Sequence, residues 1–435
     1  MKRKIIALLL LSLCFFSVLA PTTVRAADYE PETPLSSGSA AVFNVNKGIL
    51  VYGQSEHTKV SPGSTAKILT ALMALEYFEG RLDTILTVPA AALRGLEGGA
   101  VLNLKADEQI SVNDLIHATL IAGMNDAANT LALAIGGTLS KFTAMMNEKA
   151  RELGTANTFY MNPTGLSSAA YTTAYDTAKI CAYAYENKLF MEISSKRAYT
   201  IPATNLHDAV TIYTRNSFLT PKSEYYYSYA EGICTSYSNT DGAQLACAAS
   251  NGNYEYVCVS FGSKKDENGT IAGYAEVKSL LNWASSNFAE KKILDNSQII
   301  CELPVRAGKG VAHVLVVPYQ SLYSFLDKDT DLSKITLSRE MYYEKLDAPV
   351  QKGDCVGMLT VMLDGLPVGT TPLIAKSTVR QSGWGKIFLF AESVVTSKFF
   401  IISTLLSLAV TAFRTYTAIK RKRKQKYRSA NRPKV

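Results

Sequence analysis

The sequence predicts an α+β fold: an antiparallel sheet covered by helices and joined to a helical subdomain, then a small β-sandwich and a C-terminal transmembrane helix. Three observations lead to this prediction. Strand-like segments stand on both sides of a block of helical periodicity, only strand-like segments follow this block, and the chain closes with an apolar segment and a basic tail. At 435 residues the chain is long enough for two or three units with separate cores.

The first 26 residues have the pattern of a secretory signal peptide. Three basic residues at 2–4 precede an apolar run over 5–20, and small residues lead to Ala26. Such a segment is removed on export, so we expect a mature chain that begins at Ala27 and works outside the cytoplasm. The alternative is that the same segment stays in place as an N-terminal membrane anchor.

The first predicted domain spans 38–290 and begins with a β-hairpin. Alternating segments at 40–45 and 48–52 flank an Asn-Lys turn. Apolar residues then recur at helical spacing and predict a helix that starts near Ser64. Further helices are predicted at 112–121, 126–135, 141–153 and 176–184.

Three strand-like segments near the end of this domain complete its sheet. They occupy 232–237, 243–250 and 254–261, and Asp-Gly and Asn-Gly pairs separate them. Such pairs between alternating segments are strong hairpin signals. A last helix is predicted at 274–288. Because strands lie at both ends of the domain, we expect one sheet assembled from distant parts of the chain, with the active site where sheet and helices meet.

The region 293–376 contains only short strand-like segments between turn residues, which predicts a separate β-sandwich. Beyond it, 399–419 is apolar except for Arg414 and some hydroxyl residues. This segment is long enough to cross a bilayer if the Arg414 side chain extends to the interface. The alternative is an amphipathic helix that lies on the membrane surface.

The distribution of charge predicts the topology of the chain. Residues 1–26 carry four Lys and Arg, 398–435 carry eleven, and neither segment has an acidic residue, so the formal charge of +8 leaves 30 basic and 37 acidic residues, or −7, for the body. The basic tail at 420–435 is expected in the cytoplasm by the positive-inside rule, with the body exported and anchored to the outer face of the membrane. An acidic body argues against nucleic acid as a partner.

The cysteines and histidines predict no metal site and no cofactor. Cys14 lies in the predicted signal peptide, and the wide spacing of the other six predicts buried free thiols rather than a disulfide framework. The four histidines are scattered, and no Cys-x-x-Cys pair exists. The six cysteines of the mature chain are Cys181, Cys234, Cys247, Cys258, Cys301 and Cys355.

Ser64 and Lys67 are the strongest candidates for chemistry. They follow a Ser-Pro-Gly turn and lie three residues apart at the start of the predicted helix, so their side chains share one face. Apolar Ile68 and Leu69 beside Lys67 predict partial burial, which disfavours the charged amine. A neutral amine can take the Ser64 proton, so the pair predicts a serine nucleophile with a lysine base. The alternative is a chance pairing on a helix.

The order of motifs resembles that of the low-molecular-mass penicillin-binding proteins, the D-alanyl-D-alanine carboxypeptidases of peptidase family S11. The Ser-Thr-Ala-Lys segment at 64–67 carries the resemblance. Three further landmarks resemble the family in order: Asn-Asp-Ala at 125–127, Asn-Pro-Thr-Gly-Leu at 162–166 and Tyr-Thr-Thr-Ala-Tyr-Asp at 171–176. The resemblance covers 38 to about 375 and implies a serine β-lactamase/penicillin-binding-protein-like domain followed by the family's β-rich C-terminal domain.

The resemblance also implies roles for individual residues. Ser64 would attack the bond between the two terminal D-alanines of a peptidoglycan stem peptide, and β-lactam antibiotics would acylate the same serine. Lys67 would be the general base, and the N–H of Ser64 would help to hold the oxyanion. Asn125 would bind the substrate amide and orient Lys67. The alternative for Asn125 is a helix cap, together with Asp126.

Two of the family's motifs are altered in this chain. The second motif, Ser-x-Asn, reads Gly-Met-Asn at 123–125, and the third, Lys-Thr-Gly, reads Cys234, Thr235 and Ser236. Cys234 and Thr235 would line the substrate site, but the lost cation removes a charged hydrogen bond of about 1.5–3 kcal/mol, or roughly tenfold to a hundredfold in binding. We therefore expect weakened activity. Arg215 is the nearest candidate in sequence to replace this cation.

Three other interpretations follow from these changes. Cys234 could be a reactive thiol, although nothing basic lies beside it in sequence and a thiol on a strand is usually inert. The whole chain could be a non-catalytic homologue that binds cell-wall peptides. It could also be a secreted β-lactamase, which shares the serine and lysine but needs neither a second β domain nor an anchor.

Overall fold

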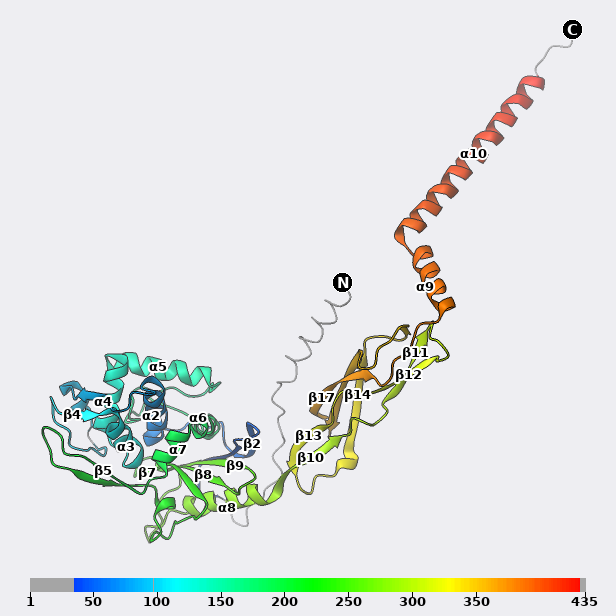
Figure 1. Cartoon of the computed structure of the whole chain (residues 1–435). Helices are drawn as coiled ribbons and strands as arrows, with labels where there is room; N and C mark the ends of the chain where they lie inside the picture. Colours follow the sequence, from blue (N-terminus) through cyan, green and yellow to red (C-terminus); the bar gives the residue numbers. More distant parts are fainter. Residues whose placement is uncertain (1–34, 97, 431–435) are drawn as a thin grey trace. The chain divides into compact units, whose positions relative to one another are not determined.

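The structure, a computed structural model of the chain, describes residues 35–96 and 98–430. The signal peptide predicted at 1–26 lies outside the described residues. The described chain falls into two compact units (Figure 1). The larger unit runs to Lys291 and includes Phe325–Asp331, and the smaller unit contains Lys292–Ser324 and the chain from Leu332 onward.

The larger unit is built on a five-stranded antiparallel sheet with strand order β2-β1-β9-β8-β7. Its first two strands come from the start of the chain and the other three from residues about 190 positions later, as the sequence predicts. The strands are β1 (Ser39–Asn44), β2 (Ile49–Gln54), β7 (Ala230–Ser238), β8 (Gly242–Ser250) and β9 (Glu255–Phe261).

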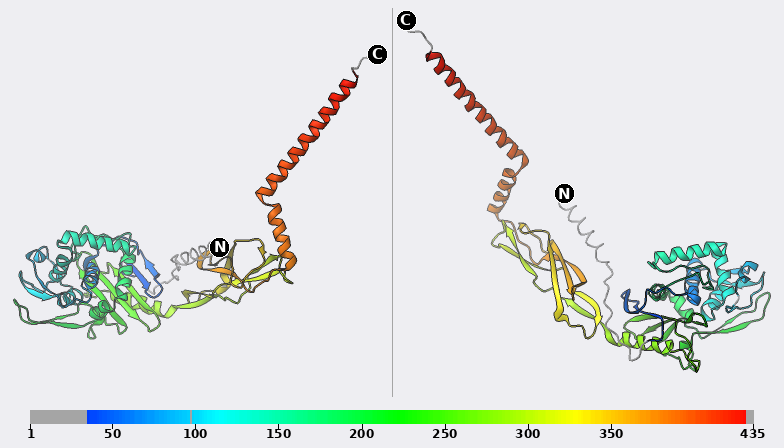
Figure 2. Two further views of the ribbon diagram at one scale, coloured as in Figure 1. Left: turned by 45° about the horizontal axis from the view of Figure 1, so that its top comes forward. Right: turned by 180° about the vertical axis from the view of Figure 1, so that it is seen from behind.

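Helices cover both faces of this sheet, because successive side chains of a strand point to opposite faces. Ala41 and Val257 pack into a core with helices on one face, whereas Val42 and Cys258 pack with the single helix α8 on the other. Figures 1 and 2 show these layers from three sides. The helices are α2 (Ala66–Tyr77), α3 (Val112–Ile121), α4 (Asn125–Gly136), α5 (Leu139–Glu152), α6 (Ala174–Glu186), α7 (Lys188–Ser194) and α8 (Gly273–Asn287).

The predicted helices are confirmed, but one α-helix and four short strands of the larger unit were not predicted. Helix α7 follows α6 after a single residue, Asn187, whose side chain accepts hydrogen bonds from the backbone N–H groups of Leu189 and Phe190. Four strands of three or four residues also interrupt the regions expected to be helical or irregular. They are too short to show a period, and they are β3 (Ile85–Thr87), β4 (Gln109–Ser111), β5 (Ala198–Ile201) and β6 (Val210–Tyr213).

The smaller unit contains the expected strands. It holds a six-stranded sheet with the order β14-β16-β17-β12-β11-β15. Separately, β10 (Phe288–Leu294) pairs with β13 (Leu322–Asp327) in a two-stranded sheet, and the residues of both strands are divided between the two units. The strands of the larger sheet are β11 (Cys301–Arg306), β12 (His313–Pro318), β14 (Ile335–Met341), β15 (Leu346–Asp347), β16 (Cys355–Leu363) and β17 (Leu366–Ala375).

Two helices end the described chain: α9 (Gly383–Val395), which was not predicted, and α10 (Lys398–Ala430). Within residues 35–96 and 98–430, Lys398–Arg423 is the one helical segment long and apolar enough to cross a membrane, and none of it is buried. This segment contains the predicted span at 399–419.

Candidate active site

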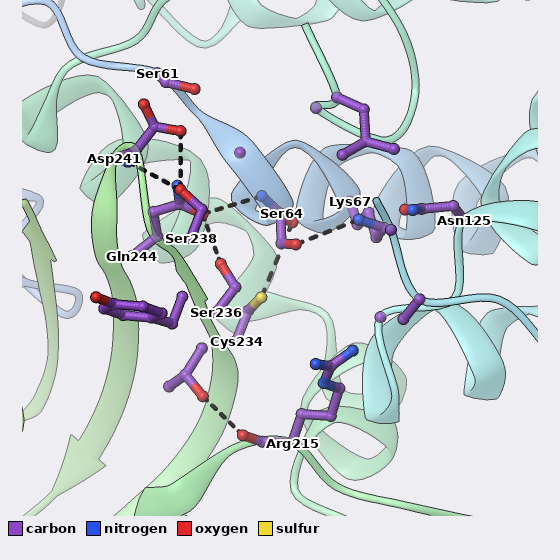
Figure 3. Close-up of a pocket in the computed structure, with 18 of the residues that line it drawn as sticks. Ser61, Ser64, Lys67, Asn125, Arg215, Cys234, Ser236, Ser238, Asp241 and Gln244 are labelled. Atoms are coloured by element: carbon purple, nitrogen blue, oxygen red, sulfur yellow. Dashed lines mark hydrogen bonds between the residues drawn. The ribbon is translucent and has the colours of Figure 1, made fainter. Parts of the chain in front are cut away.

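The larger unit contains a pocket of about 550 Å³ between the start of α2, the start of α4 and the edge strand β7 (Figure 3). Ser64 and Lys67 line it from one side, and Cys234 and Thr235 line it from the sheet. All six residues that the sequence nominates for the site line this one pocket: Ser64, Lys67, Asn125, Arg215, Cys234 and Thr235.

Ser64 is held on a short 3-10 turn, Gly63–Thr65, that leads directly into α2. The chain enters this turn at Pro62, whose carbonyl oxygen accepts hydrogen bonds from the backbone N–H of Thr65 at 3.1 Å and from its hydroxyl at 2.6 Å. Gly63 has φ of +46°, in the left-handed region that disfavours side chains. The turn places the half-buried hydroxyl of Ser64 at the pocket surface.

Lys67 lies on the first turn of α2, and its side chain is only 3% exposed. Its Nζ is 3.4 Å from the Ser64 Oγ and donates a hydrogen bond of 2.9 Å to the backbone oxygen of Thr164. The Lys67 pKa is lowered from 10.5 to about 8, mainly by burial; Cys234 opposes this shift, and the nearby Arg215 cation contributes to it. About a tenth of the amine is therefore neutral at pH 7, within reach of the serine.

The segment 162–166 presents the Thr164 carbonyl to Lys67. Asn162 Oδ1 accepts hydrogen bonds from the backbone N–H groups of Thr164 and Gly165, at 3.2 and 2.7 Å, and thereby fixes the turn. A Cβ at Gly165 would lie 1.7 Å from the carbonyl oxygen of Gly63, and φ there is +80°. The segment 162–166 thus acts as a clamp: through the Thr164 carbonyl it holds the Lys67 amine in place. The sequence pattern alone does not reveal this role.

Asn125 begins α4 as its first helical residue and does not cap it, since the capping position belongs to Met124 and no side chain caps there. The alternative interpretation as a helix cap is therefore wrong. Figure 3 shows the Asn125 carboxamide directed toward Lys67. Its Oδ1 is buried without a hydrogen-bond partner, which leaves an acceptor available at the pocket.

The neighbouring Asp126 has a structural role. Its carboxylate accepts hydrogen bonds from the backbone N–H groups of Leu102 and Leu104, at 2.9 and 3.1 Å. The Asn-Asp-Ala landmark therefore ties the start of α4 to the segment that follows the pocket-lining residues 98–100.

Cys234 occupies the strand position that faces the nucleophile. Its Sγ donates a weak hydrogen bond of 3.9 Å to the backbone oxygen of Ser64. Burial raises the Cys234 pKa to about 11, against the opposing effects of the Lys67 and Arg215 cations. The group is therefore a neutral thiol at physiological pH, which argues against the reactive-thiol interpretation.

Arg215 enters the pocket from the segment that precedes β7. Its backbone N–H donates to the Ile121 oxygen at 3.1 Å, and its backbone oxygen accepts a 3.0 Å hydrogen bond from the Thr235 hydroxyl. Thr235 thus fastens the Arg215 backbone. The Arg215 guanidinium is exposed and extends toward Cys234 and Lys67 (Figure 3). Its positive charge acts on both Lys67 and Cys234.

Gln244 is a pocket residue that sequence reasoning missed. It lies on β8, opposite Ser236 of β7. Its Oε1 accepts hydrogen bonds from the Ser236 hydroxyl at 2.6 Å and from the Ser64 backbone N–H at 3.3 Å. No sequence pattern marks this residue, because the contact joins positions 180 residues apart through the register of the sheet.

Within residues 35–96 and 98–430, no group of three or more His, Cys, Asp or Glu side chains could hold a metal ion. Cys181, Cys234, Cys247, Cys258 and Cys301 carry free thiols.

Two family profiles match consecutive parts of the chain. The profile described as D-alanyl-D-alanine carboxypeptidase matches residues 25–265, more than half of the chain. The profile described as Penicillin-binding protein 5, C-terminal domain, matches residues 288–381. The two matches correspond to the sheet-and-helix region and to the β-rich region that follows it.

Individual proteins align over most of the sequence. The chain is 25% identical over 391 residues to the D-alanyl-D-alanine carboxypeptidase DacF of Bacillus subtilis, which covers 88% of this chain and 96% of that protein. It is also 25% identical over 401 residues to the D-alanyl-D-alanine carboxypeptidase DacC of Escherichia coli, with 86% and 92% covered.

Solved structures share the fold. The D-alanyl-D-alanine carboxypeptidase DacD from Francisella tularensis superimposes with a TM-score of 0.62 at 20% identity, over 82% of this chain and 96% of that one. Penicillin binding protein 5 from Haemophilus influenzae gives 0.60 at 23% identity, over 81% and 100%. These likenesses confirm the predicted fold class. With the profile match over more than half of its length, this chain belongs to the D-alanyl-D-alanine carboxypeptidase family.

Proposed function

We propose that the chain is a serine-type D-alanyl-D-alanine carboxypeptidase that removes the terminal D-alanine of peptidoglycan stem peptides and is acylated by penicillin. One observation carries the proposal. The buried Lys67 Nζ lies 3.4 Å from the Ser64 Oγ, with its pKa lowered to about 8, at the surface of an open pocket. A serine beside a lysine that loses its proton easily is the arrangement that nucleophilic attack requires.

In the acylation step the neutral Lys67 amine acts both as a hydrogen-bond donor and as a hydrogen-bond acceptor. A neutral amine donates one N–H to the Thr164 oxygen and keeps its lone pair for the Ser64 proton. As this proton moves to Lys67, Ser64 Oγ attacks the carbonyl carbon of the D-alanyl-D-alanine bond. Collapse of the tetrahedral intermediate breaks the C–N bond, and the leaving amine takes the proton back from Lys67. Water then hydrolyses the Ser64 ester with Lys67 as base.

We assign substrate binding to two residues that line the pocket, Asn125 and Arg215. Asn125 Oδ1, buried and without a partner, accepts the substrate amide N–H. Arg215 binds the terminal carboxylate in place of the lysine that the third motif lacks. Thr235 holds Arg215 through its backbone oxygen and so acts as a positioning residue. A planar guanidinium can bind a carboxylate through two parallel hydrogen bonds.

The proposed location is the outer face of the bacterial cytoplasmic membrane. After cleavage of the N-terminal segment at 1–26, the segment at 399–419 would hold the protein in the membrane, with the basic tail at 420–435 in the cytoplasm. The length and composition of Lys398–Arg423 support a membrane span. An interfacial helix is the alternative and would leave the enzyme at the same membrane.

A second candidate, a non-catalytic homologue that binds cell-wall peptides, is favoured by Gly123. In the family's second motif this position carries a hydroxyl, and here a Cβ at Gly123 would meet nothing within 4 Å, so the space is open. The relay that this hydroxyl provides is therefore missing, while Ser64 and Lys67 remain.

The test uses the full-length chain and a stem pentapeptide that ends in D-alanyl-D-alanine. Release of D-alanine by the wild type but not by Ser64→Ala supports the carboxypeptidase. Acylation by a fluorescent penicillin without D-alanine release would favour the binding role. Rapid hydrolysis of penicillin with no persistent adduct would indicate a β-lactamase.

A further inference from the structure

The Gln244 side chain lies against residues 63 and 64, next to the nucleophile. It is 3% exposed, although it lines the pocket, and its carboxamide oxygen is the acceptor for the backbone N–H of Ser64. As the family resemblance implies, this N–H holds the negative oxygen of the tetrahedral intermediate. The Ser64 N–H that the reaction needs is therefore already hydrogen-bonded to Gln244.

Two neighbouring residues are fitted to the carboxamide. A Cβ at Gly63 would lie 2.1 Å from the Gln244 Oε1 and 2.4 Å from its Nε2, so the residue before the nucleophile has no room for a side chain. Ser236 donates its hydroxyl to the same oxygen at 2.6 Å. Ser236 stands where the third motif of the family has glycine. Gly63 and Ser236 together hold the Gln244 side chain against Ser64.

We propose that the Gln244 carboxamide occupies the oxyanion site of the resting enzyme by accepting the Ser64 N–H. Substrate must then displace this carboxamide before acylation. This inference rests on the proposed function, because it concerns the same acylation of Ser64. The developing oxyanion is a stronger acceptor than a neutral amide, so it wins the Ser64 N–H in the transition state. The acyl oxygen of the incoming substrate is a neutral acceptor like the carboxamide and must compete with it.

The experiment compares rates of acylation by fluorescent penicillin in the full-length wild type and in two variants. Gln244→Met keeps the length of the side chain and removes the acceptor. Since one neutral hydrogen bond is lost, we expect acylation about twofold to tenfold faster. Gln244→Glu keeps the shape and strengthens the acceptor, so we expect slower acylation. Gln54→Met is the matched control on β2, where the Gln54 side chain binds the Ser37 oxygen, and it should leave the rate unchanged.

A rate in Gln244→Met that is equal to or below the wild-type rate overturns the inference. A lower rate would mean that the carboxamide turns its Nε2 to the oxyanion and assists the reaction. If the wild type is labelled and Gln244→Met is labelled no faster, only the inference fails and the proposed function stands. If neither protein is labelled, the inference and the proposed function both fail. Labelling of Gln244→Met in the absence of wild-type labelling supports self-occupation of a competent site.

Hydrogen exchange at residues 62–66, measured by mass spectrometry, tests the contact between Ser64 and Gln244 without any acylation. We expect the Ser64 amide to be protected in the wild type and in Gln244→Glu, and to exchange faster in Gln244→Met. Equal exchange in the wild type and Gln244→Met would show that no such contact is held in solution and would overturn the inference, whatever the labelling rates are.

Discussion

Lys67 Nζ lies 2.9 Å from the backbone oxygen of Thr164, a residue 97 positions later in the chain. This contact gives the buried amine one fixed acceptor and leaves its other side for Ser64. No carboxylate takes part in the two Lys67 hydrogen bonds, so the amine can lose its proton without breaking an ion pair. The base therefore stays oriented in both of its protonation states.

The rate of Ser64 acylation should rise with pH and level off above about pH 8. Only neutral Lys67 can accept the serine proton, and with its pKa lowered to about 8 roughly one molecule in ten is in this form at pH 7. The measurement is the rate of labelled-penicillin acylation between pH 6 and pH 10. A flat profile, or one that falls with pH over this range, would rule out Lys67 as the base.

Lys67→Met should abolish acylation and yet stabilise the protein at neutral pH. The depressed pKa means that the unfolded chain binds more protons than the folded one between pH 8 and 10.5, so stability rises with pH across this window and the burial penalty is fully present below it. The shift corresponds to about 3 kcal/mol, from which the lost bond to Thr164 subtracts about 1.

Calorimetry on Lys67→Met at pH 7 and pH 10 measures this effect. We expect a higher unfolding midpoint than the wild type at pH 7 and a smaller difference at pH 10. Lys141→Met, an exposed lysine on α5, is the control and should show no such dependence. A variant that is less stable than the wild type at pH 7 would contradict the burial argument.

Arg215→Gln should change both substrate binding and the pH profile. Loss of the charged hydrogen bond to the terminal carboxylate is expected to raise KM for a stem peptide about tenfold to a hundredfold. Since the Arg215 cation lowers the Lys67 pKa, its removal should also move the acylation profile to higher pH. Arg215→Lys keeps the charge and should keep the profile. Unchanged kinetics in Arg215→Gln would exclude Arg215 from the site.

Gly165→Ala should destabilise the protein and abolish acylation together. The added Cβ would stand 1.7 Å from the Gly63 oxygen at a φ of +80°, so the clamp on Lys67 and the turn at Ser64 must both move. Gly80→Ala is the matched control, because φ there is +69° but nothing lies within 4 Å. We expect about 1 kcal/mol of lost stability and normal acylation for the control, and about 3 kcal/mol or more with no acylation for Gly165→Ala. Normal acylation in Gly165→Ala would contradict the clamp.

The features that depend only on the spacing of residues along the chain could be predicted from the sequence. The interval of three between Ser64 and Lys67 predicts that they share one helix face, and the structure places their reactive atoms 3.4 Å apart. Alternation and Asp-Gly turns similarly predict the sheet of the larger unit. Helix α7 and the short strands β3 to β6 escaped prediction because they contain too few residues to show a period.

Contacts made across the fold could not be predicted in this way. The acceptor at Thr164 is a backbone carbonyl, which every residue possesses, so no residue type signals it. Gln244 reaches Ser64 only because the register of β7 and β8 sets it opposite Ser236. Such a contact depends on tertiary pairing and has no periodic signature in a single sequence.

The most direct test is the location of the covalent adduct after the full-length protein reacts with benzylpenicillin at pH 8. Peptide mapping by mass spectrometry should find one penicilloyl group on the Ser64 hydroxyl of the wild type and none in Ser64→Ala or Lys67→Met. An unmodified Ser64 in wild type and Gln244→Met alike, or an adduct on Cys234 instead, would contradict a serine nucleophile activated by lysine.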